Sequence, residues 1–309
     1  MTTPHDPAPP RTPRLIALGE TMVMITPARA ESLATADELR LHIGGAESNV
    51  ATHTAALGID SAWVSAVGDD VLGERVRDTV ARRGVDVRWV RTDRDAATGV
   101  YFKDPGNGVL YYRRGSAASR MEPDTVADIP LEDAAAVHIS GITPALSPTC
   151  AALVDTVIDR VTASDALLSF DVNHRAALWE PGQAAPTLLA LARRADIVFV
   201  GLDEAETVWG CRTPDEVRSL IPEPTMLVVK DGDVGATEFT RADGADTGTF
   251  VAAIPTEVVE PVGAGDAFAA GHLAAMMDGA DAPGRLTAGH ARAHLVLLST
   301  SDFVDEPLH

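Results

Sequence analysis

The sequence predicts an α/β fold, a doubly wound parallel sheet with helices on both faces in a three-layer α/β/α sandwich. The first observation is a series of short apolar runs, typical of buried parallel strands, at residues 15–18, 22–25, 61–67, 136–140, 167–171, 197–200 and 226–230. The second is that helix-like segments separate most of these runs, at residues 48–57, 73–83, 148–162, 185–194 and 203–209. Strands and helices that alternate in this way form βαβ units, so we expect the runs other than 22–25 to pair in one sheet.

One region breaks the alternation and predicts a second, smaller sheet. Residues 97–115 read ATGVYFKDPGNGVLYYRRG, where two β-branched or aromatic runs flank a turn signal rich in Pro, Gly and Asn. We expect a hairpin here, and we expect it to join the early runs in a lid formed from about 21–44 and 97–118. A small sheet beside a large one makes a cleft, and a movable cover over a cleft excludes water during chemistry.

The composition is that of an ordinary globular protein with an acidic surface. Of 309 residues, 46% are hydrophobic and 23% are charged, and 45 acidic against 25 basic side chains give a net charge of −20. Such a charge opposes binding to nucleic acid or to anionic membranes, so neither is expected as a partner. We expect the proline-rich residues 1–13 to form a disordered tail and residues 14–309 to form one domain.

The cysteines and the apolar runs bear on the compartment. Cys150 and Cys211 show no CxxC or histidine-rich spacing, so neither a disulfide framework nor a zinc site is expected. The first residues lack the apolar core of a signal peptide, and no apolar run has the length of a membrane span. A cytoplasmic protein is the interpretation that fits these observations.

The stretch EPVGAGDAFAAG at 260–271 carries the chemistry, and three interpretations compete for it. A tight turn into a helix would need nothing more from Asp266 than a favourable charge in the first turn. A dinucleotide fingerprint is disfavoured because Phe268 stands where GxGxxG needs glycine, and a Walker A loop lacks its GK[ST]. Phosphoryl transfer explains both the glycines and the carboxylate. The catalytic residues would then be Gly263, Ala264, Gly265 and Asp266.

In the phosphoryl-transfer interpretation each residue has a defined role. The backbone N–H groups of Ala264, Gly265 and Asp266 would meet the charge on the transferring phosphoryl group. The glycines would let that group approach the backbone closely. Asp266 would take the proton from the attacking hydroxyl.

Two segments of the sequence resemble the signatures of one family, the PfkB or ribokinase-like carbohydrate kinases. GAGDAFAAG at 263–271 resembles the C-terminal signature, and GGAESNVA at 44–51 resembles the N-terminal one, followed by the glycine-rich turn GDDVLG at 68–73. The resemblance extends over nearly the whole chain. It implies a ribokinase-like sandwich with a β-sheet lid, ATP and Mg²⁺ as cofactors, and a sugar bound in part by Gly44, Gly45 and Asn49.

The lid and a later segment narrow the resemblance to the 2-keto-3-deoxygluconate kinases. TGVY at 98–101 and YYRRGSA at 111–117 resemble their lid, and DVNHR at 171–175 with the following Leu-Trp resembles their DxNxRxxLW segment. The resemblance implies that a sugar acid is held by Tyr101, Tyr111, Arg113, Asn173 and Arg175, with Asp266. Guanidinium groups suit a carboxylate, and aromatic rings with hydroxyls suit a sugar.

The sequence leaves some alternatives open in the lid and in the substrate. Of Tyr111 and Tyr112 one can be a packing residue, and of Arg113 and Arg114 one can be a surface charge. The segment GETMVMITP at 19–27 lacks the aspartate that ribokinases use for ribose, whereas fructokinase-like enzymes share the DxNxR segment and remain the nearest competitor. A non-catalytic sugar-binding regulator on the same fold and a nicotinamide oxidoreductase are alternatives from other classes.

The nucleotide side also resembles the family, with three departures. VVKDGDVGA at 228–236 resembles the family's KxGxxG strand and turn. The resemblance implies that Lys230, Gly232 and Gly235 bind ATP together with Gly263 and Gly265. A plain β-turn would explain Gly232 and Gly235 as well. The family's NxxE glutamate matches Glu204, which implies a contact to magnesium through water. Gly201 replaces the asparagine of that motif, and Glu260-Pro261 replaces the usual Asp-Thr.

Two expectations concern metals and oligomers. The histidines form no convincing ligand set, and His290 and His294, four apart on a predicted helix, are more simply a packed or solvated pair. Apolar strands in a lid need covering, so we expect a homodimer that pairs two lids.

Overall fold

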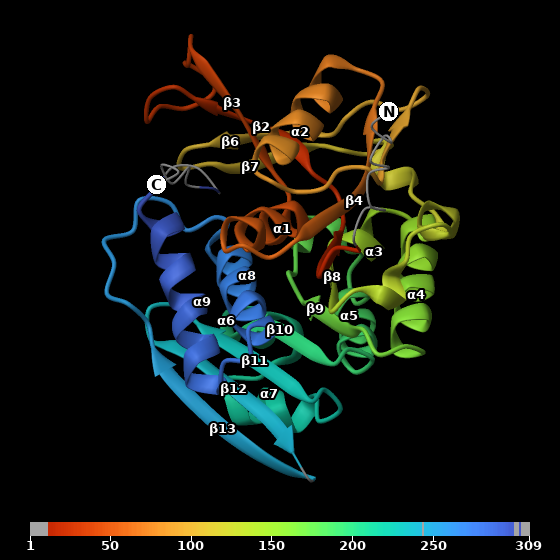
Figure 1. Ribbon diagram of the computed structural model, residues 1–309. Helices are drawn as coiled ribbons and strands as arrows, with labels where there is room; N and C mark the ends of the chain where they lie inside the picture. The colour runs from red at the N-terminus through yellow and green to blue at the C-terminus, as the bar shows by residue number, and fades with distance from the viewer. Residues whose placement is uncertain (1–11, 243, 300–302, 304–309) are drawn as a thin grey trace, which may run out of the picture.

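The computed structural model describes residues 12–242, 244–299 and 303 (Figure 1). The tail predicted for residues 1–13 therefore lies, except for its last two residues, outside the described residues. Within the described part of the chain, no helix is both long and apolar enough to cross a membrane.

The main sheet has nine strands in the order β13-β12-β11-β10-β9-β8-β1-β4-β5. From β11 to β5 every neighbouring pair is parallel, whereas β11, β12 and β13 are antiparallel. In chain order the strands are β1 (Leu15–Leu18), β4 (Ser61–Gly68), β5 (Val90–Asp93), β8 (Ala136–Ser140), β9 (Leu167–Asp171), β10 (Ile197–Gly201), β11 (Met226–Asp231), β12 (Gly235–Ala242) and β13 (Ala245–Ala252). This arrangement confirms the predicted doubly wound sheet and adds an antiparallel edge to it.

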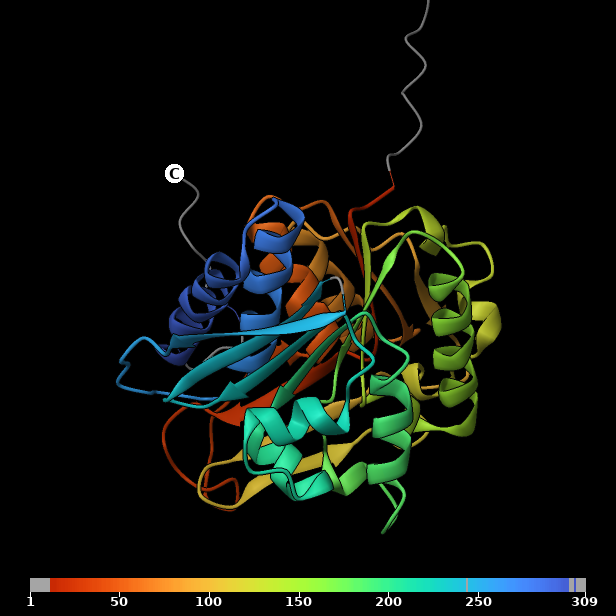
Figure 2. The same cartoon turned by 90° about the horizontal axis from the view of Figure 1, so that it is seen from below.

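Helices cover both faces of this sheet (Figure 2). One group packs with the largest buried cluster and consists of α4 (Pro148–Thr162), α5 (Ala184–Ala192), α6 (Leu202–Trp209) and α7 (Pro214–Leu220). The other group packs with two further clusters and consists of α1 (Ala46–Ala56), α2 (Val71–Arg82), α8 (Ala264–Met277) and α9 (Ala282–Leu297). Short helices connect these elements: α3 (Thr143–Leu146) and the 3-10 turns Ala118–Arg120, Pro123–Val126, Leu131–Asp133 and Ala176–Leu178.

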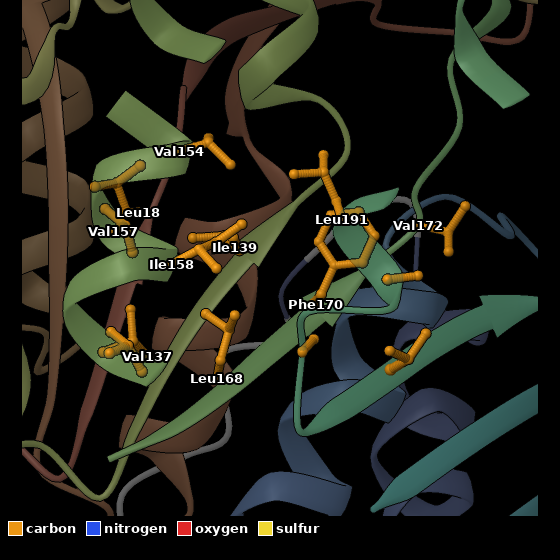
Figure 3. Close-up of a cluster of buried hydrophobic side chains, with 14 of the residues drawn as sticks. Leu18, Val137, Ile139, Val154, Val157, Ile158, Leu168, Phe170, Val172 and Leu191 are labelled. Atoms are coloured by element: carbon orange, nitrogen blue, oxygen red, sulfur yellow. The ribbon is translucent and has the colours of Figure 1, made fainter. Parts of the chain in front are cut away.

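The first face of the sheet shows how the sequence forms this core (Figure 3). Helix α4 begins at Pro148 after Ser147, whose hydroxyl accepts a hydrogen bond from the Cys150 N–H at 3.1 Å. Its apolar residues recur at helical spacing, so they form one stripe. That stripe meets the apolar side chains of β8 and β9, and the contacting residues include Val137, Ile139, Val154, Val157, Ile158, Leu168 and Phe170.

A second sheet of four strands stands beside the main one, in the order β3-β2-β6-β7 (Figure 1). Its strands are β2 (Met22–Pro27), β3 (Leu39–Gly44), β6 (Val100–Asp104) and β7 (Gly108–Tyr112). The predicted hairpin is confirmed, because β6 and β7 pair antiparallel with Tyr101 opposite Tyr111. Gly106 and Gly108 in its turn have φ angles of 82° and 97°, which only glycine adopts at low cost.

The antiparallel edge of the main sheet was not predicted from the sequence beyond the turn at Gly235. Strand β13 is exposed or half-buried along its length, so it lacks the continuous apolar run that marks a buried strand. It pairs with β12 over its whole length, from Ala245 opposite Ala242 to Ala252 opposite Gly235. This hairpin extends the sheet next to β11 and leads the chain toward α8.

Candidate active site

A cleft of about 880 Å³ lies between the lid and the carboxyl ends of the parallel strands. Ligand sites of open α/β sheets occupy this edge, where loops follow the strands. The sixteen residues that the sequence predicted for the site all line this cleft: Gly44, Gly45, Asn49, Tyr101, Tyr111, Arg113, Asn173, Arg175, Glu204, Lys230, Gly232, Gly235, Gly263, Ala264, Gly265 and Asp266.

Asp266 lies in the first turn of α8, where two asparagines orient its carboxylate. The amide of Asn49 donates to Oδ2 of Asp266 at 2.9 Å, and the amide of Asn173 is 3.4 Å from Oδ1. Asn49 comes from α1, and Asn173 follows β9 with a left-handed φ of 38°, so its backbone is held in an uncommon conformation. Both carboxylate oxygens therefore accept a hydrogen bond, and the two amides fix the orientation of the group.

The turn before Asp266 begins the helix at Gly263, whose φ of 85° requires glycine. The Ala264 N–H donates to the carbonyl of Pro261 at 3.3 Å, and the Ala267 N–H donates to the carbonyl of Gly263 at 2.9 Å. A Cβ at Gly265 would lie 3.3 Å from Nζ of Lys230. The start of α8 and an ammonium group therefore border the same space, which suits an anion.

Lys230 is paired with Asp171 across β10, at the carboxyl ends of β11 and β9. Its Nζ lies 3.0 Å from Oδ2 of Asp171, and the two side chains are 18% and 4% exposed. Burial disfavours the charged amine, but the carboxylates of Asp171, Glu204 and Asp266 outweigh it and raise the pKa of Lys230. The lysine is thus a permanent cation in the cleft.

Glu204 faces the cleft with its carboxylate fixed by two backbone groups. The Gly201 N–H donates to Oε2 at 2.9 Å and the His174 N–H donates to Oε1 at 3.0 Å. Burial, together with the nearby Asp171, raises the pKa of Glu204. A Cβ at position 201 would lie 2.5 Å from the carboxylate of Asp203. A glycine in place of the family's asparagine therefore leaves the space that the Asp203 side chain occupies.

The described residues contain no group of three His, Cys, Asp or Glu side chains close enough to hold a metal ion by themselves. A magnesium ion in this cleft would therefore keep most of its water ligands. It would be bound through the phosphates of a nucleotide and one or two carboxylates. Glu204, with acceptor capacity left on both oxygens, suits that role.

The lid places Tyr101 and Tyr111 toward the cleft and Tyr112 away from it. Tyr101 and Tyr111 stack with ring centroids 5.8 Å apart, and both line the cleft. Tyr112 points to the opposite face, where it is 64% exposed and meets Phe102 edge-on. Successive side chains on a strand alternate between faces, which is why adjacent tyrosines separate in this way.

Arg113 lies in the cleft, but its charge is compensated by a residue that the sequence did not assign to the site. Its Nε donates to Oε2 of Glu20 at 2.6 Å, and the hydroxyl of Ser116 also donates to this carboxylate. Arg113 and Glu20 are 8% and 3% exposed, whereas Arg114 is exposed. Glu20 follows β1 closely at the carboxyl edge of the sheet, a position that marks it as a candidate.

Arg175 is the less compensated cation on the sugar side. Its Nη1 donates to the carbonyl of His174 at 3.1 Å and lies 3.9 Å from Oε1 of Glu204, with 45% of the side chain exposed. An arginine this exposed can rotate toward a ligand at little cost. Its guanidinium suits a carboxylate.

The far end of the cleft was also missed, because its residues carry no sequence motif. It is lined largely by apolar side chains from the segment after β13 and from α9, including Ile254, Val258, Ala293 and Leu297. His294 bonds through Nδ1 to the hydroxyl of Thr256 at 2.6 Å. His290 bonds through Nε2 to the Val251 carbonyl at 3.1 Å, and burial lowers the pKa of His290.

In this doubly wound sandwich with a lid, the cleft holds a carboxylate in the first turn of a helix and a half-buried lysine beside it, an arrangement suited to phosphoryl transfer to a small molecule. A model of the pfkB family of carbohydrate kinases matches residues 12–307. The chain therefore belongs to the pfkB family and is a carbohydrate kinase.

Two curated relatives are sugar-acid kinases by name. The 2-dehydro-3-deoxygalactonokinase of Haloferax volcanii is 32% identical, over 92% of this chain and 91% of that protein. The 2-dehydro-3-deoxygluconokinase of Bacillus subtilis is 33% identical, over 93% and 90%. A probable fructokinase-3 of Arabidopsis thaliana is 28% identical, over 85% and 78%.

Solved structures share the fold. A PfkB protein from Polaromonas superposes with a TM-score of 0.84 at 32% identity, covering 92% of this chain and 95% of that one. The 2-dehydro-3-deoxygluconokinase of Thermotoga maritima superposes with a TM-score of 0.81 at 22% identity, over 94% and 96%. The predicted ribokinase-like sandwich is confirmed.

Proposed function

We propose that this carbohydrate kinase transfers a phosphoryl group from ATP to the terminal primary hydroxyl of 2-keto-3-deoxygluconate, also called 2-dehydro-3-deoxygluconate, giving the 6-phosphate. The observation that carries the proposal is the carboxylate of Asp266. Two asparagines orient it 2.9 and 3.4 Å away, and it lies beside Lys230 and opposite the lid tyrosines.

The chain's residues divide the work of the reaction. Asp266 accepts the proton of the sugar hydroxyl, whose oxygen then forms the new bond to phosphorus while the bond to the leaving oxygen breaks. Lys230 and the N–H groups at the start of α8 stabilise the negative charge on the transferring group. Asn49 and Asn173 keep the carboxylate in the direction of the hydroxyl.

ATP and Mg²⁺ are the cofactors that suit this cleft. ATP supplies the phosphoryl group, and magnesium shields its negative charge. Gly263, Gly265 and Lys230 would hold the phosphates, with Gly232 and Gly235 in the adjoining turn, and the apolar far end near Ile254 and Val258 would take the base. Glu204 would hold the metal through its waters.

The choice of a sugar acid rests on the cations and tyrosines of the sugar side. Arg175 is available for a carboxylate, and Tyr101 with Tyr111 offers a stacked aromatic wall. Arg113 would act together with Glu20 and so would offer the sugar a hydrogen-bonding pair rather than an isolated charge. The names of the relatives from Haloferax and Bacillus support this class, while the relative from Arabidopsis keeps fructose as the alternative.

We also propose that the protein is a homodimer that pairs two lids. On the face of the lid away from the cleft, an apolar row crosses all four strands: Leu41 pairs with Ile25, Ile25 with Phe102, and Phe102 with Leu110. Leu41 and Leu110 are 40% and 50% exposed. A second copy of the same sheet would cover this row.

The test of the function is an ADP-release assay with 2-keto-3-deoxygluconate, its galacto epimer, gluconate, fructose and ribose. The proposal predicts that the two 2-keto-3-deoxy acids are the best substrates by kcat/KM. In Arg175→Ala the KM should rise at least tenfold for the sugar acid and by less for fructose. A preference for fructose in the unaltered protein would establish the fructokinase alternative, and no ADP release with any sugar would indicate a binding regulator.

A further inference from the structure

An ion pair joins the lid to the segment that leads into α8. Lys103 lies on β6 two residues after Tyr101, so both side chains face the cleft. Nζ of Lys103 is 3.8 Å from Oε2 of Glu260, and the two side chains are 12% and 29% exposed. The pair therefore joins two segments that both border the cleft, the lid strand β6 and the segment before α8.

Glu260 in turn is connected to the start of α8. Its Oε1 accepts a hydrogen bond from the Val262 N–H at 3.2 Å, and the preceding Val259 N–H donates to the carbonyl of Leu297 in α9 at 2.8 Å. Pro261 restricts the backbone φ angle between Glu260 and Val262. A displacement of the Glu260 carboxylate would therefore also displace the turn at 261–264, which leads directly into α8 and Asp266.

We propose that Lys103 is a positioning residue that couples the sugar-binding lid to the phosphate-binding turn through Glu260. The inference rests on the proposed function, since it assigns sugar to the lid side and phosphate to the turn. Lid closure over a sugar would hold Glu260 and the turn in the conformation that accepts a nucleotide. By linkage, a bound nucleotide would favour the closed lid to the same extent.

The environment of the pair supports a coupling of useful size. A fully exposed pair contributes little because water and salt screen it, whereas both of these side chains are largely removed from solvent. The glutamate stands where the family usually has the shorter aspartate, and its additional methylene extends the reach toward the lid. The family departure at 260 thus has a physical explanation in this chain.

Hydrogen–deuterium exchange on the ligand-free protein tests the coupling without any assumption about the sugar. The variants are Lys103→Met, Glu260→Gln and the double variant, and the control is Arg40→Met, an exposed cation of the same lid that does not line the cleft. We expect each single variant to accelerate exchange at residues 262–266 by about three- to tenfold. The double variant should exchange no faster than either single one, and Arg40→Met should match the unaltered protein.

Unchanged exchange at 262–266 in Lys103→Met would overturn the inference, and so would additive effects of the two substitutions, which would mean that Lys103 acts independently of Glu260. A second measurement is the dissociation constant of ADP with and without the best sugar of the panel. In the unaltered protein the sugar should tighten ADP at least fivefold, and in Lys103→Met this factor should fall toward one. If none of the five sugars led to ADP release in the kinase assay, the proposed function would be contradicted. The exchange experiment uses the ligand-free protein, so it would still decide whether Lys103 and Glu260 are coupled.

Discussion

Asp266 is the residue on which the proposed chemistry depends most. Replacing it with asparagine keeps the shape of the side chain but removes the base, so kcat should fall by a factor of about 10² to 10⁴. Binding of sugar and ADP should change little, because the groups that hold them remain. Steady-state kinetics and calorimetry on Asp266→Asn measure the two effects separately, with the exposed Asp128→Asn as control. An equal loss of affinity and rate would contradict the role as base.

Glu47 is a second residue with an unusual environment, one that bears on stability. Its side chain is completely buried, and Oε1 accepts hydrogen bonds from Ser140 at 2.6 Å and from Thr143 at 3.2 Å, whereas Oε2 has no hydrogen-bond partner. Burial raises the pKa of Glu47 from 4.5 to about 7. Gly19 leaves the space for this carboxyl, since a Cβ there would lie 2.1 Å from it.

A carboxyl whose pKa is higher in the folded state than in the unfolded state stabilises the fold only while it is protonated. Its contribution to the free energy of unfolding is fully present below pH 4.5 and is lost as the pH rises to about 7, a change on the order of 3 kcal/mol. Glu47→Gln cannot titrate, so its stability relative to the unaltered protein should increase by that amount across this window. Urea unfolding at pH 5 and at pH 8 measures the difference, and parallel pH curves would show that Glu47 does not carry it.

Helix α8 contributes both to the proposed site and to the packing of the core. Substitutions at two of its glycines, Gly265 and Gly271, test these two roles separately. At Gly265 an added Cβ would lie 3.3 Å from Nζ of Lys230, in the space proposed for phosphate. Gly265→Ala should therefore lower kcat/KM for ATP at least tenfold while the stability stays equal or rises by up to about 1 kcal/mol. Kinetics and thermal unfolding test both parts.

Gly271 in the same helix is the matched control. A Cβ there would lie 2.4 Å from the carbonyl oxygen of Ala288 in α9, so Gly271→Ala should lower the melting temperature because the two helices must separate. If the two substitutions had the same effect on stability, α8 would not be divided into a functional and a packing part.

The elements that the sequence predicted best are those with the strongest periodic signal. Strands β1, β8 and β9 and helix α4 have the predicted bounds, because a strand buried on both faces is a continuous apolar run and α4 carries a clear start signal at Ser147-Pro148. The exposed β13 lacks such a signal, and its formation depends on pairing with β12 in the tertiary structure. Helix α7 was not predicted although Thr213, Pro214 and Glu216 form a readable start signal, because the helix is only seven residues long.

The site shows the same division. The motif residues were predicted to share a cleft, and they line it. The ion pairs of the site could not be predicted from the sequence. Arg113 with Glu20 and Lys103 with Glu260 join segments that are far apart in the chain. The burial of Glu47 likewise follows from three elements that meet around it.

At the scale of the whole molecule, the lid surface predicts the oligomeric state. Light scattering should give a mass of about twice the 32.4 kDa chain for the unaltered protein. Leu110→Asp should shift the mass to that of the monomer, because a charge cannot be buried in the apolar row. Val234→Asp, at a position 55% exposed between β11 and β12, is the control that should remain dimeric. A monomer of the unaltered protein at all concentrations would refute the dimer.

The hydrogen bond between Asn49 and Asp266 has a consequence for biosynthesis. Its partners are 217 residues apart, and α1, which carries Asn49, packs on α8. At about 5–20 residues per second, a ribosome makes the second partner roughly 10–45 s after the first. During that interval the helix that bears Asn49 lacks its packing partner, so polar side chains of α1 that are buried in the folded protein stay exposed to solvent in the nascent chain. Ligand binding that requires both halves can begin only after α8 leaves the exit tunnel.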